Sequence, residues 1–85
     1  MAKLIKQYSF AEKRKFWGSE LDRLFNIQVG KNGRKRTKAE QERFEYAQGF
    51  YSSSKNGNLS KNFNDLTFPK QLGEIAGFKA KKTNK

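Results

Sequence analysis

Apolar residues in the first third of the chain recur at intervals that place them on one face of a helix. They are Phe10, Trp17, Leu21, Leu24 and Phe25. Ser9 stands three residues before Glu12, which is the spacing of a capping box that satisfies backbone N–H groups of a first helical turn. The pattern therefore predicts a helix from about residue 10 to residue 26.

A second helical pattern follows a glycine-containing loop at residues 28–36. Thr37 and Glu40 repeat the capping-box spacing. The apolar face behind them consists of Ala39, Phe44, Ala47, Phe50 and Tyr51. We expect this helix to end near Ser54, before a turn at residues 56–58. Since Gly18 and Gly49 sit in the middle of the two helices, we predict a close crossing of these helices at the two glycines.

The last third of the chain is less regular. Pro69 suits the first position of a helix and Gly77 suits the residue just past a helix end, which predicts a short helix over 69–76. Phe78 would then fold back onto that helix. The expected fold class is mainly α, a two-helix hairpin-like core with a short C-terminal helix and irregular basic loops. We expect one small helical domain over 1–78 and a basic flexible tail over 79–85.

The composition narrows the possible chemistry. The chain has 85 residues, of which 34% are hydrophobic, so its core is near the lower limit for independent folding. It contains no cysteine and no histidine, which removes disulfides, thiolate ligands, the usual zinc ligand and the usual general base. The serines at 52–54 have no evident activating base, and we interpret them as a helix end that runs into a loop. We expect no enzymatic activity, no cofactor and no metal site.

The net charge of +11 indicates a negatively charged partner. The helical segments 9–26 and 37–55 are nearly balanced, with net charges of +1 and zero, so the loops and termini carry the other +10. The densest cationic run lies at the start of the second predicted helix. A helix N-terminus favours anions, so cations placed there suggest that an anion binds beside them. The candidate binding residues are this run, Lys31, Arg34, Lys35, Arg36 and Lys38, together with Lys79, Lys81 and Lys82 in the tail.

The aromatic residues have two possible roles, in the core or in contact with a partner. Phe16–Trp17 and Phe50–Tyr51 could stack on unpaired bases, but at helical spacing we assign them to the core. Phe63 or Phe68, if exposed, would be a better anchor for a partner, but we favour the core for these two as well.

No apolar run approaches the roughly 20 residues needed to cross a membrane. The apolar stretch at residues 1–6 is too short for a signal peptide, so we expect no secretion by this route.

Three segments carry a family resemblance. Residues 8–18 (YSFAEKRKFWG), 33–36 (GRKR) and 44–55 (FEYAQGFYSSSK) resemble a class of small basic bacteriophage proteins. The class shares an opening Y-[ST]-x-A-E-K-R-x-[FY], a G-K-R-like turn and a later F-x-x-G-[FY] segment. In this sequence, residues 21–29 are longer than the glycine-rich stretch usual there. The resemblance implies an accessory or virion setting, and hence a location in a host cytoplasm or a virion, and it transfers no functional residue.

These observations leave three hypotheses. The first is a protein that binds nucleic acid, DNA rather than RNA, largely without regard to sequence. The second is a virion structural component bound to an acidic capsid or portal surface, assembled as an oligomer or into a larger particle. The third is an inhibitor of a host protein. None of the three involves a membrane.

Overall fold

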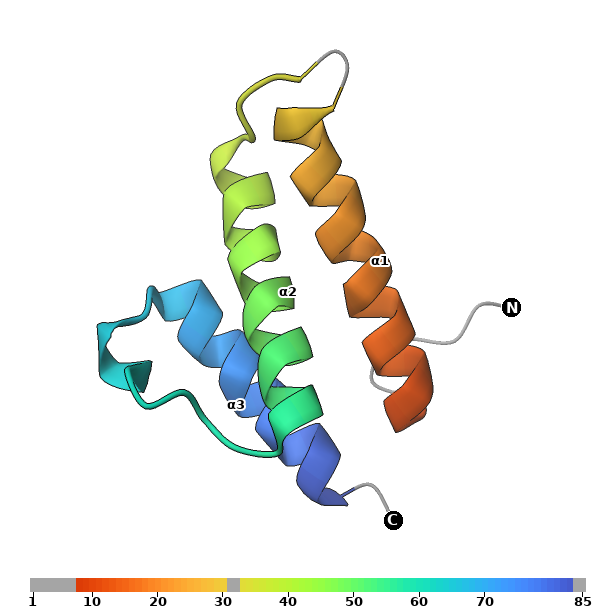
Figure 1. Ribbon diagram of the computed structural model, residues 1–85, viewed down its shortest axis with the longest axis vertical. Helices are drawn as coiled ribbons and strands as arrows, with labels where there is room; N and C mark the ends of the chain where they lie inside the picture. The colour runs from red at the N-terminus through yellow and green to blue at the C-terminus, as the bar shows by residue number, and fades with distance from the viewer. Residues whose placement is uncertain (1–7, 31–32, 84–85) are drawn as a thin grey trace.

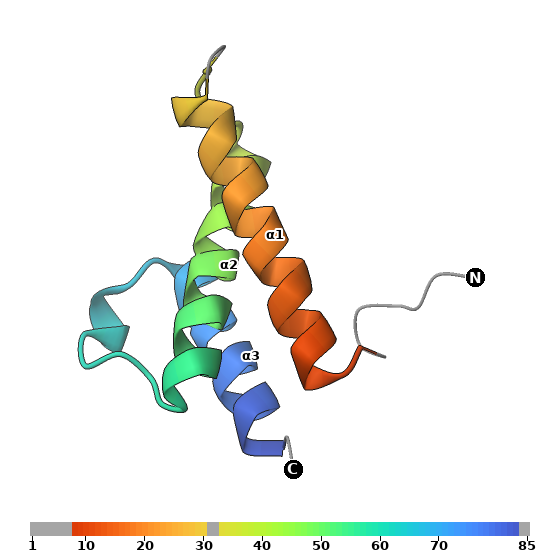
Figure 2. The same ribbon diagram turned by 45° about the vertical axis from the view of Figure 1, so that its right-hand side comes forward.

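The computed structural model describes residues 8–30 and 33–83, and within these ranges the chain is helical with no strand. Its elements are α1 (Phe10–Val29), α2 (Lys38–Asn56), the short 3₁₀ helix η2 (Phe63–Asp65) and α3 (Phe68–Thr83). In the views of Figures 1 and 2, α1 and α2 form an antiparallel hairpin, and α3 crosses α2 so that its last turns lie near the start of α1. The mainly α fold class, with a two-helix core and a C-terminal helix, is confirmed.

Both predicted helix starts are confirmed by their capping boxes. The Ser9 amide donates to Glu12 Oε1 (2.8 Å), and the Glu12 amide donates back to Ser9 Oγ (3.2 Å). Thr37 and Glu40 make the same exchange at 2.9 and 3.2 Å. The ends lie further along the chain than predicted. α1 continues to Val29, and α2 continues to Asn56, where Gly57 adopts the left-handed conformation (φ 75°) that a glycine accepts at a helix end.

The closest helix packing is between α2 and α3, not between α1 and α2 as predicted. A Cβ added at Gly73 would overlap the carbonyl oxygen of Tyr46, and one at Gly49 would overlap that of Lys70. A Cβ at Gly77 would meet Ser53 Oγ and the backbone of Phe50. Each of these glycines therefore lets one helix backbone lie directly on the other. Gly18 does face α2, but its neighbour there is the Tyr51 ring, so the predicted Gly18–Gly49 crossing is wrong.

The same contact explains why α3 was predicted too short. Gly77 was expected to follow the end of a helix, whereas it lies inside α3 and is buried against α2. The helix continues to Thr83, so Phe78 is a half-buried helical residue and not a folded-back contact. Residues 79–83 of the predicted flexible tail form the last turns of α3, and residues 84–85 lie outside the described part.

The core is thin. The buried apolar side chains are Trp17, Leu24, Phe44, Ala47 and Phe50, and the Cα trace spans 41 × 39 × 17 Å. Each outer helix packs mainly on α2, and α1 and α3 have little contact with each other. The assignment of the Phe16–Trp17 and Phe50–Tyr51 pairs to the core holds for Trp17 and Phe50 and not for Tyr51, which is 39% exposed.

A buried carboxylate fixes the segment between α2 and α3. Glu74 is 1% exposed, and its side chain accepts hydrogen bonds from the backbone amide and the hydroxyl of Ser60. Ser53 donates its hydroxyl hydrogen bond to the Glu74 carbonyl oxygen (2.8 Å). The serines at 52–54 are therefore part of α2, and Ser53 packs at the α2–α3 contact instead of leading into a loop. Among the described helices, none is long and apolar enough to cross a membrane.

The glycine contact gives a test of the fold. Gly73→Ala places a methyl group on the α2 backbone, so we expect a loss of about 2–3 kcal/mol in the free energy of unfolding. Gly18→Ala meets only the ring of the partly exposed Tyr51, which can move, and alanine favours the helix, so we expect a change within about 1 kcal/mol. Urea unfolding followed by far-ultraviolet circular dichroism measures both. Equal stabilities for the two variants would contradict this packing.

Candidate functional site

The structure uses Arg34 of the predicted binding run in a contact within the chain. Its guanidinium makes two hydrogen bonds to the Glu40 carboxylate, at 2.9 and 3.0 Å. This pairing, helped by the Thr37 amide, lowers the pKa of Glu40 to about 2 and raises that of Arg34. Arg34 remains exposed over 55% of its side chain. Its charge is nevertheless matched by a neighbouring carboxylate.

Arg36 joins α1 to α2. It donates to the Leu24 carbonyl oxygen (2.9 Å) and to Gln41 Oε1 (2.8 Å), and its guanidinium lies 4.0 Å from the centre of the Phe44 ring. The side chain is only partly exposed. Arginine suits this position because its planar group can stack on a ring and donate several hydrogen bonds at once. We assign Arg36 to the fold of the hairpin.

These contacts weaken the argument that the cations at the N-terminus of α2 require a bound anion. The N-terminus of α2 is already capped by Thr37 and Glu40, and Glu40 supplies the negative charge that the helix dipole favours. Lys35 and Lys38 are exposed, and Lys31 lies outside the described residues. The two arginines of this run are held by residues of the chain itself, and the assignment of the run to anion binding stays a prediction.

The tail lysines lie at the opposite end of the molecule. The start of α1 and the ends of α2 and α3 come together there, far from the loop that joins α1 to α2 (Figure 1). Lys81 connects them, because its Nζ lies 5.7 Å from the centre of the Phe10 ring and its side chain borders Gly57. The structure therefore does not bring the two groups of predicted site residues together.

We call this region the lysine-rich end. Its basic residues are Lys13, Arg14, Lys15, Lys55, Lys79, Lys81 and Lys82, and its acid is Glu12, a net charge of +6. Residues 20–23 and 33–45, toward the other end, sum to +1, because five carboxylates there offset six cations. The excess charge is therefore concentrated where three helix ends meet.

Arginines and lysines have different roles in this structure. The ion pairs between described residues, Arg23–Glu20, Arg34–Glu40 and Arg43–Glu20, all use arginine. Arg14 lies over the Tyr51 ring and donates to Ser54 Oγ (3.1 Å). No lysine in the described ranges forms an ion pair with a described carboxylate. The charge that remains for a partner is therefore lysine charge, which the total of +11 could not reveal.

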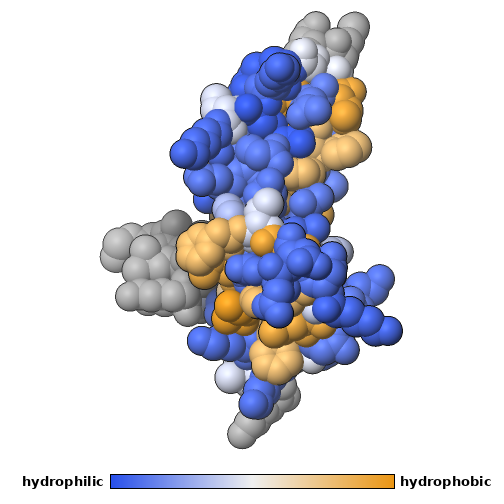
Figure 3. Space-filling model, turned by 90° about the vertical axis from the view of Figure 1, so that its left-hand side faces the viewer, coloured by the Kyte–Doolittle hydropathy of each residue, from blue (hydrophilic) through white to orange (hydrophobic). Residues whose placement is uncertain are grey.

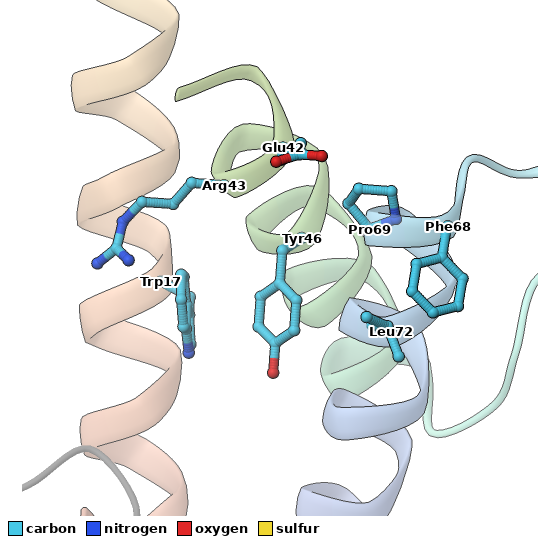
Figure 4. A pocket seen from close by; sticks show the side chains of 7 residues that line it. All are labelled: Trp17, Glu42, Arg43, Tyr46, Phe68, Pro69 and Leu72. Carbon is cyan, nitrogen blue, oxygen red and sulfur yellow. The ribbon is translucent and has the colours of Figure 1, made fainter. Parts of the chain in front are cut away.

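A second feature is an apolar groove of about 420 Å³ between α1 and α3, with α2 as its floor. Figure 4 shows Trp17 projecting from α1 and Tyr46 from α2, opposite Phe68, Pro69 and Leu72 on α3. The Trp17 and Tyr46 rings are 4.8 Å apart at their centres. Phe68 is 70% exposed and Leu72 is 42% exposed.

Of the residues in this groove, the sequence analysis considered Phe68 as a partner anchor but favoured the core for it, whereas the structure leaves it 70% exposed. Its alternative, Phe63, is half-buried. The groove exists because α1 and α3 diverge on either side of α2, and no motif marks that divergence.

Figure 3 shows that the exposed apolar surface on the side of the 57–67 segment is broken into patches among hydrophilic surface. No group of three or more Asp or Glu side chains in residues 8–30 and 33–83 is arranged to hold a metal ion.

Comparison with known proteins adds no assignment: no family model, curated protein or solved structure matches this chain. The resemblance to small basic phage proteins stays a prediction.

The role given to Arg36 can be tested against its neighbour. Arg36→Ala removes hydrogen bonds from a charged group to Leu24 and Gln41, so we expect a loss of about 2 kcal/mol of unfolding free energy. Lys35→Ala removes an exposed side chain and should change stability by less than about 0.5 kcal/mol. Thermal unfolding measures both variants. An Arg36→Ala protein as stable as the wild type would contradict the assignment of Arg36 to the fold.

The ion pairs of Glu20 predict a dependence of stability on pH. Hydrogen bonds from Arg23, and also from Arg43, lower the pKa of Glu20 from 4.5 to about 2. Because the pKa is lower in the folded state, this stabilisation is fully present above pH 4.5 and is lost as the pH falls toward 2. Glu20→Gln should reduce the slope of stability against pH in this window, measured by urea unfolding at a series of pH values. An unchanged slope would contradict the assignment.

Proposed function

We propose that this protein is a non-enzymatic nucleic-acid-binding protein that contacts phosphates through its lysine-rich end, largely without regard to base sequence. The observation that carries the proposal is the concentration of unpaired lysines where the ends of α1, α2 and α3 meet. The carboxylate at the lysine-rich end is that of Glu12, which belongs to the capping box of α1. A surface of this kind attracts a polyanion by its field.

The use of lysine also favours this class of partner. A lysine ammonium is a hydrated point charge on a flexible stem, and it contacts phosphate without a fixed geometry. Base recognition relies instead on groups such as arginine and asparagine held at base edges. In this protein each arginine makes contacts within the chain. The arrangement therefore suits backbone contacts, which position a protein on nucleic acid and carry no sequence information.

Such binding releases counterions from the nucleic acid. On duplex DNA the logarithm of the binding constant falls against the logarithm of salt concentration by about 0.9 for each phosphate neutralised. The slope therefore counts the contacts made by the protein. It also separates phosphate binding from binding to an uncharged surface.

The test compares two triple variants with equal loss of charge. Changing Lys55, Lys81 and Lys82 to Ala should weaken binding to a short mixed-sequence duplex at least tenfold at low salt and reduce the salt slope by about 2 to 3. The control changes Lys35, Lys38 and Lys61, which lie elsewhere, and should cost less than about threefold. Fluorescence anisotropy of labelled DNA over a series of salt concentrations gives both quantities.

Three results would contradict the proposal. The first is no binding to duplex or single-stranded DNA at low salt. The second is binding that does not respond to salt. The third is an equal loss of affinity in the two triple variants, which would show that the total charge matters and the lysine-rich end does not. Circular dichroism of both variants checks that the helices are intact.

A further inference from the structure

The groove between α1 and α3 has no role in phosphate binding, because its lining is mainly apolar. It is open along one side, and Leu72 and Phe68, one helical turn apart on α3, face Trp17 across it (Figure 4). Three helices ordinarily cover one another's apolar faces around a shared core. Here the two outer helices diverge, so part of the apolar face of α2 is left without a covering element.

We propose that this groove binds an acidic amphipathic helix of another protein, which lies between α1 and α3 as a fourth helix. A helix presents apolar side chains every three or four residues, and this spacing fits a groove with an apolar wall on each side and an apolar floor. Phe68 is the main anchor on this chain, since its ring is 70% exposed and stands at the edge of the groove. Leu72 forms the next contact along α3.

Charge identifies the partner as acidic. Lys13 lies one helical turn before Trp17, and Lys79 lies two turns after Leu72, so both are on the helix faces that border the groove. At the other end of the groove, Arg43 is paired with Glu20, Glu42 lines the groove and Glu45 accepts a hydrogen bond from Thr67, so the cations that face an acidic partner are those at the Lys13 and Lys79 end. The net charge of +11 opposes a second copy of this chain as the occupant and attracts an acidic segment.

The rings of the groove are poorly placed for nucleic-acid bases. Base stacking needs an open ring face. Trp17 is 8% exposed and packs against Phe16 and Tyr46, with ring centres 5.0 and 4.8 Å apart. The groove, with a volume of about 420 Å³ and both Tyr46 and Leu72 in its lining, instead offers space for an aliphatic side chain such as leucine. The geometry therefore favours a helix over a single strand of nucleic acid.

The experiment uses a designed peptide of about 18 residues, long enough for five helical turns. It carries leucines on one face and glutamates elsewhere, with no tryptophan. Trp17 is the only tryptophan of the chain and lines the groove, so its fluorescence reports occupancy directly. We expect saturable binding with a shift of Trp17 emission. A scrambled peptide of identical composition, which has no apolar face, should bind at least tenfold more weakly.

Matched variants locate the contact. Phe68→Ala combined with Leu72→Ala should weaken peptide binding at least tenfold, whereas Phe25→Ala, which removes another exposed phenylalanine ring outside the groove, should change it by less than twofold. The groove variant should keep its affinity for DNA, and the variant of Lys55, Lys81 and Lys82 should keep at least a third of its affinity for the peptide. The failure of one proposal is thus distinguishable from the failure of the other.

Several outcomes would overturn the inference. Equal binding of the scrambled peptide would show charge attraction alone. Equal losses in the Phe68/Leu72 and Phe25 variants would place the contact elsewhere. A dimer in sedimentation experiments that Phe68→Ala and Leu72→Ala dissociate would assign the groove to a second copy of the chain. Absence of any peptide binding at low salt would also end the proposal.

Discussion

The direct contact between the backbones of α2 and α3 holds this small fold together. Gly49, Gly73 and Gly77 remove the side chains that would separate the two helices, and Ser53 fits beside Gly77 and donates to the Glu74 carbonyl oxygen. Close approach increases the dispersion contacts that each helix makes, which matters in a chain with few buried apolar side chains. Glu74, buried next to this contact, then fixes the returning segment through Ser60. The packing of α3 thus also sets the course of residues 57–67.

α1 packs on α2 through a smaller apolar interface, and polar contacts between the two helices supplement it. Arg43 pairs with Glu20 and lies over the Trp17 ring, and Arg36 reaches the backbone of α1 at Leu24. Arginine serves at such places because it combines a charge, a flat stacking face and several donors. Since arginines satisfy the carboxylates in these contacts, the lysines are left in solvent, and most of the local excess charge lies at one end of the molecule.

The two proposals therefore concern neighbouring surfaces that arise from the same packing and meet at Lys13 and Lys79. The lysine-rich end forms because the start of α1 and the ends of α2 and α3 meet, and the apolar groove forms because α1 and α3 diverge farther along α2. A partner in the groove would cover exposed apolar area at Phe68 and Leu72, and nucleic acid would neutralise charge at Lys55, Lys81 and Lys82. A protein with both surfaces could hold an acidic protein segment and a nucleic acid at the same time.

The sequence by itself determined the helical class and the starts of α1 and α2, because capping boxes and the 3.6-residue period act over a few neighbouring residues. It also determined the total charge and the absence of histidine and cysteine. Only the tertiary structure decided the rest. The local sequence around Gly77 fits a helix end and a helix–helix contact equally well, so it does not decide between them. The burial of Gly73 against Tyr46 depends on residues distant in the chain. Likewise, a run of cations shows no sign of which members make contacts within the chain: Arg34 is bound by Glu40 and Arg36 by the Leu24 carbonyl oxygen. Lys81 and Lys82 are neighbours in the sequence, but only the packing of α2 and α3 places Lys55 at the same end of the molecule.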